Sequence, residues 1–280
     1  MATKTKEVKK TGGKPGTAVV KAGQGGSPAL QKSLKDRIKK DANKGLSTNM
    51  SDNIVPLVYV LQAQSPQTQK RNEKYVEGAE AGSLWLRNSA DPIVDGEEGF
   101  DFQPCFYWRG FIEWQPNRGG FVARHDAKPE GTKVKKIKND KGDEVEAMVT
   151  PAGNILVESM EWAGFILGRG APMGYVIPCS GSNRGFSKEL MTALNNRFDE
   201  DNNKLPAWWN IVRVKSKYRT NDKGSWFMFD FDPEIGEIST EEDYIRGQRL
   251  NAAFEGGEKQ AAVDETEVGG SSSSDGDDDI

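Results

Sequence analysis

The sequence predicts a mostly β protein with antiparallel sheets and appended helices. Short runs rich in β-branched and aromatic residues recur along the chain, separated by glycine, asparagine and aspartate turns. The clearest run, residues 208–231, alternates Val212 and Val214 with basic residues, turns at Thr220–Gly224 and continues as an aromatic strand. We therefore expect a β-hairpin in this stretch.

The two ends of the chain differ in composition from its middle. Residues 1–26 are rich in Lys, Gly, Thr and Ala and hold too little apolar surface to fold, so we expect a disordered basic arm. Ser27 and Pro28 then predict the start of a basic amphipathic helix over residues 27–45. Residues 255–280 are rich in Gly, Glu, Ser and Asp, which predicts a disordered acidic tail.

The net charge of −4 over 280 residues hides a polarity along the chain. Residues 1–45 hold 12 Lys or Arg and 3 Asp or Glu, a net charge of +9, whereas residues 255–280 hold 1 and 9, a net charge of −8. The middle of the chain therefore carries −5. These opposite charges indicate that each end binds a partner of its own, or that one end competes for the partner of the other end.

One folded domain is expected over residues 53–254. Its predicted strands are apolar or aromatic runs at residues 54–61, 83–87, 102–114, 121–125, 155–167 and 173–178, with a charged hairpin over residues 133–150. Gly110 interrupts the longest of these runs and is interpreted as a β-bulge.

Two helices are expected within the domain. Ser187 predicts the N-cap of a helix with Leu190 and Leu194 on its apolar stripe. Ser239 and Glu242 have the spacing of a capping box and predict the start of a last helix.

A first group of strands, one helix and a closing hairpin is the order expected of an OB-fold, a small Greek-key barrel whose exposed strand face binds oligonucleotides. The domain is longer than the minimal version. We therefore predict an elaborated OB-fold-like antiparallel barrel between the basic arm and the acidic tail. A β-sandwich with appended helices is the alternative, because counting strands does not separate the two folds.

One face of the predicted 208–231 hairpin carries a row of cations. Arg213, Lys215, Lys217 and Arg219 alternate along the strand and so share one side, and the partner strand carries Trp226. Cations follow phosphates and aromatic rings stack on bases, a combination typical of single-stranded nucleic acid binding. The ordinary alternative is a solvated face that keeps a half-buried sheet soluble.

A second stretch of strands also mixes rings and cations. Tyr107, Arg109 and Phe111 share one parity of the run 102–114, and a dry core would not combine a cation with rings in this way. Arg124 follows on the next strand. We therefore include these four residues in the candidate nucleic-acid interface, although most aromatic residues in strands pack in cores.

The sequence has few residues suited to catalysis or to metal binding. Cys105 and Cys179 lie far apart and outside any CxxC pair, and the single histidine, His125, has no recognisable catalytic partner and is interpreted as structural. We therefore predict no catalytic residue, no metal site and no cofactor. The chain shows no apolar run near the ~18 residues of a membrane span and no signal peptide, so a cytoplasmic protein is expected.

Several short motifs resemble DNA-metabolism proteins of tailed bacteriophages. They are the apolar run Pro56–Leu61 followed by Gln62 and Ser65–Gln67, the step Tyr107–Arg109 before Glu113 and Trp114, the pair Gly119 and Gly120, and the group Asn221, Gly224 and Trp226. Over residues 53–231 the chain is similar to single-stranded DNA-binding proteins of such phages. The resemblance implies sequence-tolerant binding of single-stranded DNA during replication or recombination in the host cytoplasm.

The acidic end resembles the tails through which single-stranded DNA-binding proteins recruit replication and repair enzymes. The residues that this resemblance assigns to partner binding are Asp275, Asp277, Asp278, Asp279 and Ile280. Such tails usually finish with phenylalanine, and Ile280 departs from that pattern. The alternative function is that of a phage structural or assembly protein without nucleic-acid binding. Either function is compatible with a homo-oligomer.

Overall fold

The computed structural model of the protein describes residues 54–116, 120–138, 142, 144–168, 174–222, 224–257 and 260–261, together with Arg37, which is helical. The predicted basic arm, the rest of the predicted helix 27–45 and the acidic tail beyond residue 261 lie outside these residues. The strands and helices that follow all belong to one compact unit, Thr48–Ile280.

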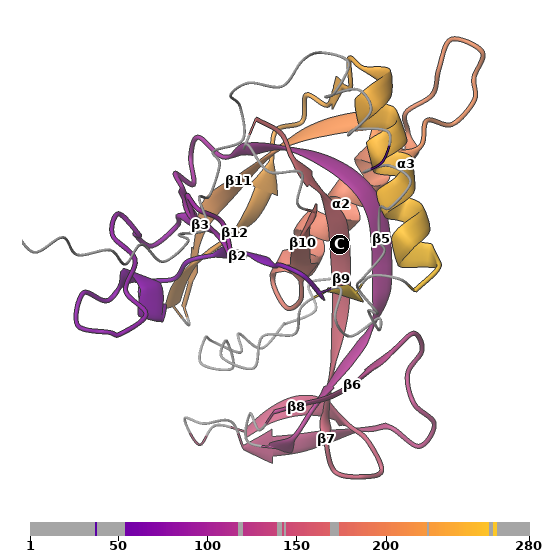
Figure 1. The fold of residues 1–280 in the computed structure, drawn as a ribbon. Coiled ribbons are helices and arrows are strands. Elements are labelled where there is room, and N and C mark those ends of the chain that lie inside the picture. Colours follow the sequence, from indigo (N-terminus) through magenta and orange to yellow (C-terminus); the bar gives the residue numbers. More distant parts are fainter. Residues whose placement is uncertain are drawn as a thin grey trace, which may run out of the picture. The chain divides into compact units, whose positions relative to one another are not determined.

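The described part of the chain is mainly β-strand (Figure 1). The strands are β1 (Ile54–Val55), β2 (Val58–Val60), β3 (Leu84–Leu86), β4 (Ile93–Val94), β5 (Phe100–Trp114), β6 (Phe121–His125), β7 (Lys133–Lys138), β8 (Glu144–Val149), β9 (Ile155–Ile166), β10 (Gly174–Cys179), β11 (Asn210–Asn221), β12 (Gly224–Phe231), β13 (Gly236–Glu237) and β14 (Gln260–Ala261). The helices are α2 (Asn183–Asn195) and α3 (Glu241–Glu255), with 3-10 turns η2 (Pro66–Thr68) and η4 (Ala207–Trp209).

Most strands join one antiparallel sheet, which has nine strands in the described residues. Its hydrogen-bonded order is β12-β11-β5-β9-β8-β7, with β6 also paired to β5, β10 to β9 and β13 to β11. Strands β2, β3 and β4 form a second, antiparallel sheet, and β1 pairs in parallel with β14. The predicted mostly β class is thereby confirmed, as is the hairpin of β11 and β12.

The predicted closure of the sheet into a barrel is not observed. The two end strands of the path, β12 and β7, are not paired with each other in the part of the chain that the structure describes. The long strands β5 and β9 pair from Phe102 and Ile166 to Trp114 and Ile155. Figure 1 shows β6, β7 and β8 at the far end of these two strands, away from both helices.

One face of the nine-stranded sheet packs against helix α2 and is called the α2 face below. Phe102, Trp162 and Val212 point to this side and are at most 1% exposed. They contact the apolar stripe of α2, which includes Phe186 and Leu190, and the three-stranded sheet covers the rest of the cluster. This layer is the main hydrophobic core.

Helix α2 begins earlier than the sequence predicted. Ser187 is not its N-cap, because the helix starts at Asn183 and Ser187 is fully buried inside it. The Ser187 hydroxyl accepts a hydrogen bond of 2.9 Å from the indole nitrogen of Trp162. A serine that satisfies a buried indole N–H has the same appearance in the sequence as a capping serine, which explains the error.

The opposite face of the sheet is partly covered by helix α3 and is called the α3 face. Gln103 points to this side, is fully buried, and donates hydrogen bonds to the carbonyl oxygens of Trp208 and Asp243 at 2.8 and 3.1 Å. Gly247 of α3 allows this close packing, because a Cβ atom there would lie 2.6 Å from the Cβ of Trp208. The helix is thereby fixed against the start of β11.

The N-cap of α3 differs by one residue from the predicted capping box. Thr240, not Ser239, caps the helix, and its hydroxyl accepts a hydrogen bond of 3.1 Å from the backbone N–H of Asp243. Both pairs, Ser239 with Glu242 and Thr240 with Asp243, have the capping spacing, so the sequence does not distinguish them.

The β-bulge of β5 also lies elsewhere than predicted. The register with β9 shifts between Pro104 and Phe106, where the proline has no N–H to give to the ladder. Gly110 is in regular register, opposite Ser159. The close approach of Trp108 requires glycine at this position, because a Cβ atom there would lie 2.3 Å from a ring carbon of Trp108.

A buried polar network holds the far end of β5. Glu113 is 8% exposed and accepts hydrogen bonds from Thr150 and Asn154 at 3.0 and 2.8 Å, and its second oxygen lies 2.7 Å from Nε2 of His125. The bonds from Asn154, His125 and Thr150 lower the pKa of Glu113 despite its burial. His125 therefore has the structural role expected of it.

Candidate nucleic-acid interface

The four cations of β11 lie on the α3 face of the sheet. Val212 and Val214 are fully buried in the core on the α2 face, so the residues that alternate with them point the other way. These residues are Arg213, Lys215, Lys217 and Arg219. Arg213 and Lys215 are half-buried, whereas Lys217 and Arg219 are exposed. The row therefore becomes more accessible toward the turn of the hairpin.

Three of these four cations have an aspartate partner on a neighbouring segment. Arg213 pairs with Asp101 of β5 at 2.8 Å. Lys217 pairs with Asp230 of β12 at 3.2 Å, and Lys215 pairs at 2.9 Å with Asp232, which directly follows this strand. These acids reduce the positive charge of the row, which the alternation of residues along β11 did not reveal.

Arg219 makes no ion pair with any residue that the structure describes. It lies opposite Trp226 on β12, whose indole nitrogen is buried and has no hydrogen-bond partner in the described residues. On the other side of the hairpin, Tyr218 is 56% exposed and meets the ring of Phe227 edge to face, with 5.2 Å between centroids. The end of the hairpin thus combines free positive charge with accessible aromatic surface.

Tyr107, Arg109 and Phe111 lie on the opposite side of the sheet from the cation row. The bulge between Pro104 and Phe106 adds one residue to β5 and so moves these three side chains to the α2 face. The structure therefore does not bring them together with β11, and the single composite surface predicted from the sequence is wrong.

Tyr107 is half-buried at the margin of the core. Its ring lies 4.7 Å from that of Trp162 and packs against the main hydrophobic cluster. Burial raises the pKa of its hydroxyl, although a hydrogen bond with Ser187 opposes this effect. The side of the ring that meets Trp162 is therefore not open to a base.

Arg109 remains accessible and shares a carboxylate with a second arginine. Its side chain is 59% exposed and lies 2.6 Å from Glu158, which also accepts a hydrogen bond of 3.0 Å from Arg184 of α2. Burial raises the pKa of Glu158, but the hydrogen bonds from the two arginines outweigh it and the net change is downward. Phe111 lies directly opposite Glu158 and is half-buried. Sequence reasoning missed Arg184, whose only signal is its place in the first turn of a helix.

Arg124 is in a third place, on the α3 face of strand β6. Its guanidinium lies 4.2 Å from the ring centroid of Trp108 and 2.5 Å from the carboxylate of Glu161. Burial raises the pKa of Glu161, against the opposing effect of Arg124. Trp108 lies seven positions after Asp101 on β5, roughly 23 Å along the strand, so Arg124 is distant from the β11 row. Its side chain is mostly buried and serves packing.

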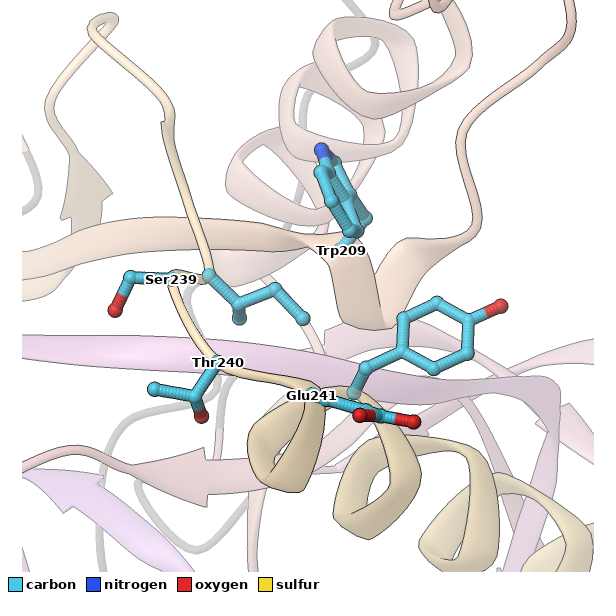
Figure 2. Close-up of a pocket in the computed structure, with 6 residues that line it drawn as sticks. Trp209, Ser239, Thr240 and Glu241 are labelled. Atoms are coloured by element: carbon cyan, nitrogen blue, oxygen red, sulfur yellow. The ribbon is translucent and has the colours of Figure 1, made fainter.

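An aromatic recess that sequence reasoning did not single out lies at the start of β11 (Figure 2). It has a volume of about 420 Å³ and is lined by Trp209, Ile238, Ser239, Thr240, Glu241 and Tyr244. The signal for it is the Trp208–Trp209 pair directly before the basic strand.

Other candidate sites are absent or outside the described residues. In these residues no group of three or more His, Cys, Asp or Glu side chains could hold a metal ion. Cys105 and Cys179 are free and buried. No helix within the described ranges is long and apolar enough to cross a membrane. The predicted partner-binding residues Asp275 to Ile280 lie beyond the described chain.

Comparison with known proteins identifies the family of the chain. The sequence profile of the Pam3 phage gp34-like protein family matches residues 27–260. No curated protein and no solved structure matches the chain significantly. The match spans the two helices and both β-sheets described above, which makes this a phage protein. The chain belongs to the Pam3 phage gp34-like protein family.

Proposed function

We propose that this phage protein binds single-stranded DNA without strong sequence preference, through the end of the β11–β12 hairpin. One observation carries the proposal: Lys217 and Arg219 are exposed there, Arg219 has no ion pair in the described residues and lies opposite Trp226, and Tyr218 is exposed on the other side of the hairpin. Cations that follow the phosphates and rings that stack on bases are the two requirements of such binding.

The aspartates along the row do not oppose this proposal. In these three ion pairs, the side chains of Arg213, Lys215 and Lys217 are 34–47% exposed. Exposed pairs of this kind contribute about 0–1 kcal/mol each, because water screens them. A DNA phosphate can therefore replace an aspartate at small cost, with counterion release favouring the exchange.

A role for the acidic segment forms part of the proposal. We infer that residues beyond 261, including Asp275, Asp277, Asp278, Asp279 and Ile280, recruit replication or recombination proteins. The support is their charge, because residues 262–280 hold seven Asp or Glu and no Lys or Arg. No cofactor or catalytic residue is invoked.

A phage structural or assembly protein is the second candidate function. It is favoured by the ion pairs that neutralise most of the β11 row, which suit a solvated surface. The end strands β12 and β7 of the sheet path also offer edges on which further chains could pair.

A binding titration distinguishes the two functions. We expect labelled single-stranded oligonucleotides to bind the full chain at low salt, and a Lys217→Glu, Arg219→Glu variant to bind at least tenfold more weakly. A matched control is Lys133→Glu, Lys135→Glu, which makes the same charge change on exposed residues of β7. Equal affinities of the two variants, or no binding by the unmodified protein, would favour the structural candidate.

A further inference from the structure

The aromatic recess beside α3 has rigid walls. Trp209 ends the turn η4, and its carbonyl oxygen accepts a hydrogen bond of 3.0 Å from the backbone N–H of Ile238. The ring of Tyr244, in the first turn of α3, meets the rings of both Trp208 and Trp209 with 6.2 Å between centroids. Fully buried Asn210 fixes the turn by donating to the carbonyl oxygens of residues 206 and 207. A planar ligand would meet surfaces that are already in place.

The rim of the recess selects against anions. Glu241 lines the recess together with the hydroxyl-bearing Ser239 and Thr240, which lead along the chain into the start of α3 (Figure 2). Thr240 is already engaged by Asp243, whereas Glu241 is exposed and forms no ion pair in the described part of the chain. The acidic first turn of α3 repels a phosphate and accepts hydrogen bonds from N–H donors.

The recess lies next to the start of the cation row along the chain. Trp209 directly precedes β11, and residues 211 and 213 follow on the same α3 face. Arg213 is thus four residues, or roughly 13 Å along the strand, from the recess. A strand of DNA whose phosphates lie along Arg213 to Arg219 would bring a base to Trp209.

We propose that this recess holds one nucleobase that carries an exocyclic amino group, stacked on Trp209 or Tyr244 and hydrogen-bonded to Glu241. The inference rests on the proposed function and adds a base preference to it. A carboxylate accepts a hydrogen bond from the amino group of cytosine or adenine. Thymine has no amino group, and its two carbonyl oxygens flank the single N–H and repel a carboxylate. Binding of amino-bearing bases is therefore tighter.

The test compares oligo-dC with oligo-dT, each about 12 nucleotides long, by fluorescence anisotropy at low salt. The unmodified protein binds oligo-dC more tightly, and Glu241→Gln removes much of this difference. Glu242→Gln is the matched control, since Glu242 is exposed, changes charge equally and does not line the recess. Trp209→Ala weakens binding about tenfold and Trp209→Phe restores most of it, as expected for a stacking ring.

Two outcomes separate this inference from the proposed function. If both oligonucleotides bind equally and Glu241→Gln and Glu242→Gln behave alike, the recess does not read a base, although DNA binding stands. If neither oligonucleotide binds, the proposed function fails. Titration with free cytidine and thymidine, which carry no phosphate, then tests the recess alone: shifts of the Trp209 indole N–H signal with cytidine only support it, and no shift with either overturns it.

Discussion

Arg213 of β11 lies directly opposite Asp101 of β5, and the two side chains form an ion pair with 2.8 Å between Nε and Oδ1. The residues are 112 positions apart in the chain. Lys215 and Lys217 also pair with aspartates, but diagonally across the hairpin, with Asp232 and Asp230. The cation row is therefore compensated by acids from other segments, and its capacity to bind DNA depends on how readily those acids give way.

Removal of two of these acids should strengthen DNA binding. In an Asp230→Asn, Asp232→Asn variant, Lys215 and Lys217 lose competing carboxylates and are free for phosphates, so we expect a severalfold gain in affinity for single-stranded oligonucleotides at low salt. Glu144→Gln, Glu146→Gln on β8 is the control with the same change in net charge. A gain of equal size in both variants would show that only net charge matters.

The salt dependence of binding should report the number of phosphates contacted. If four cations each neutralise one phosphate, the slope of log K against log salt is about −0.7 × 4, or near −3, for single strands. Lys217→Ala, Arg219→Ala should bring it to about −1.5. Titrations between roughly 20 and 200 mM salt measure the slope. A slope that is unchanged in the variant would exclude these two residues from the interface.

The sequence predicts what depends on neighbours along the chain. The alternation of Val212 and Val214 with the cations correctly separates a core face from a polar face, because side chains of a strand alternate. The strands β5, β6, β7, β8 and β11 were predicted nearly to their ends for the same reason. Whether a sheet closes into a barrel depends instead on which strands distant in the sequence pair with each other, and the local sequence pattern does not predict this pairing.

The prediction of the candidate site was wrong where one extra residue in a strand moves the following side chains to the other face of the sheet. The bulge between Pro104 and Phe106 puts Tyr107, Arg109 and Phe111 on the side opposite the β11 row. Their mixed composition was correctly read as unusual for a core, and its cause is Glu158, which pairs with Arg109 at the margin of the core. The sequence of such a strand offers several positions for a bulge, here Pro104 and Gly110, and does not show which of them is used.

Tyr107 should contribute to stability and not to binding. Its ring packs on Trp162, so Tyr107→Ala leaves a cavity in a half-buried site, and we expect a loss of about 2 kcal/mol in the free energy of unfolding. Tyr107→Phe keeps the ring and should leave oligonucleotide affinity unchanged. Urea unfolding and anisotropy titrations measure the two effects. Weaker DNA binding by Tyr107→Phe at unchanged stability would place the hydroxyl in the interface instead.

The network of Glu113 should make stability depend on acidic pH. The folded protein lowers the pKa of Glu113 below its ordinary value of 4.5, so its carboxylate stabilises the fold fully above that pH. This contribution is lost as the pH falls through the lower folded pKa. Glu113→Gln should therefore cost about 1–3 kcal/mol near pH 7, and the difference from the unmodified protein should shrink below about pH 4. The exposed Glu130→Gln is the control, and urea unfolding at each pH is the measurement.

Deletion of residues 262–280 should raise the affinity for DNA. These residues hold seven Asp or Glu and no Lys or Arg, and they continue from Ala261, which is buried in the same apolar cluster as Ala163. If the segment has the disorder that its composition predicts, its root-mean-square span of roughly 24 Å gives it a high effective concentration at nearby cations. It then competes with phosphates, most strongly at low salt, where the Debye length is long. Anisotropy titrations of both chains at roughly 20 and 200 mM salt measure the competition, and equal affinities at both salts would leave the segment no role in DNA binding.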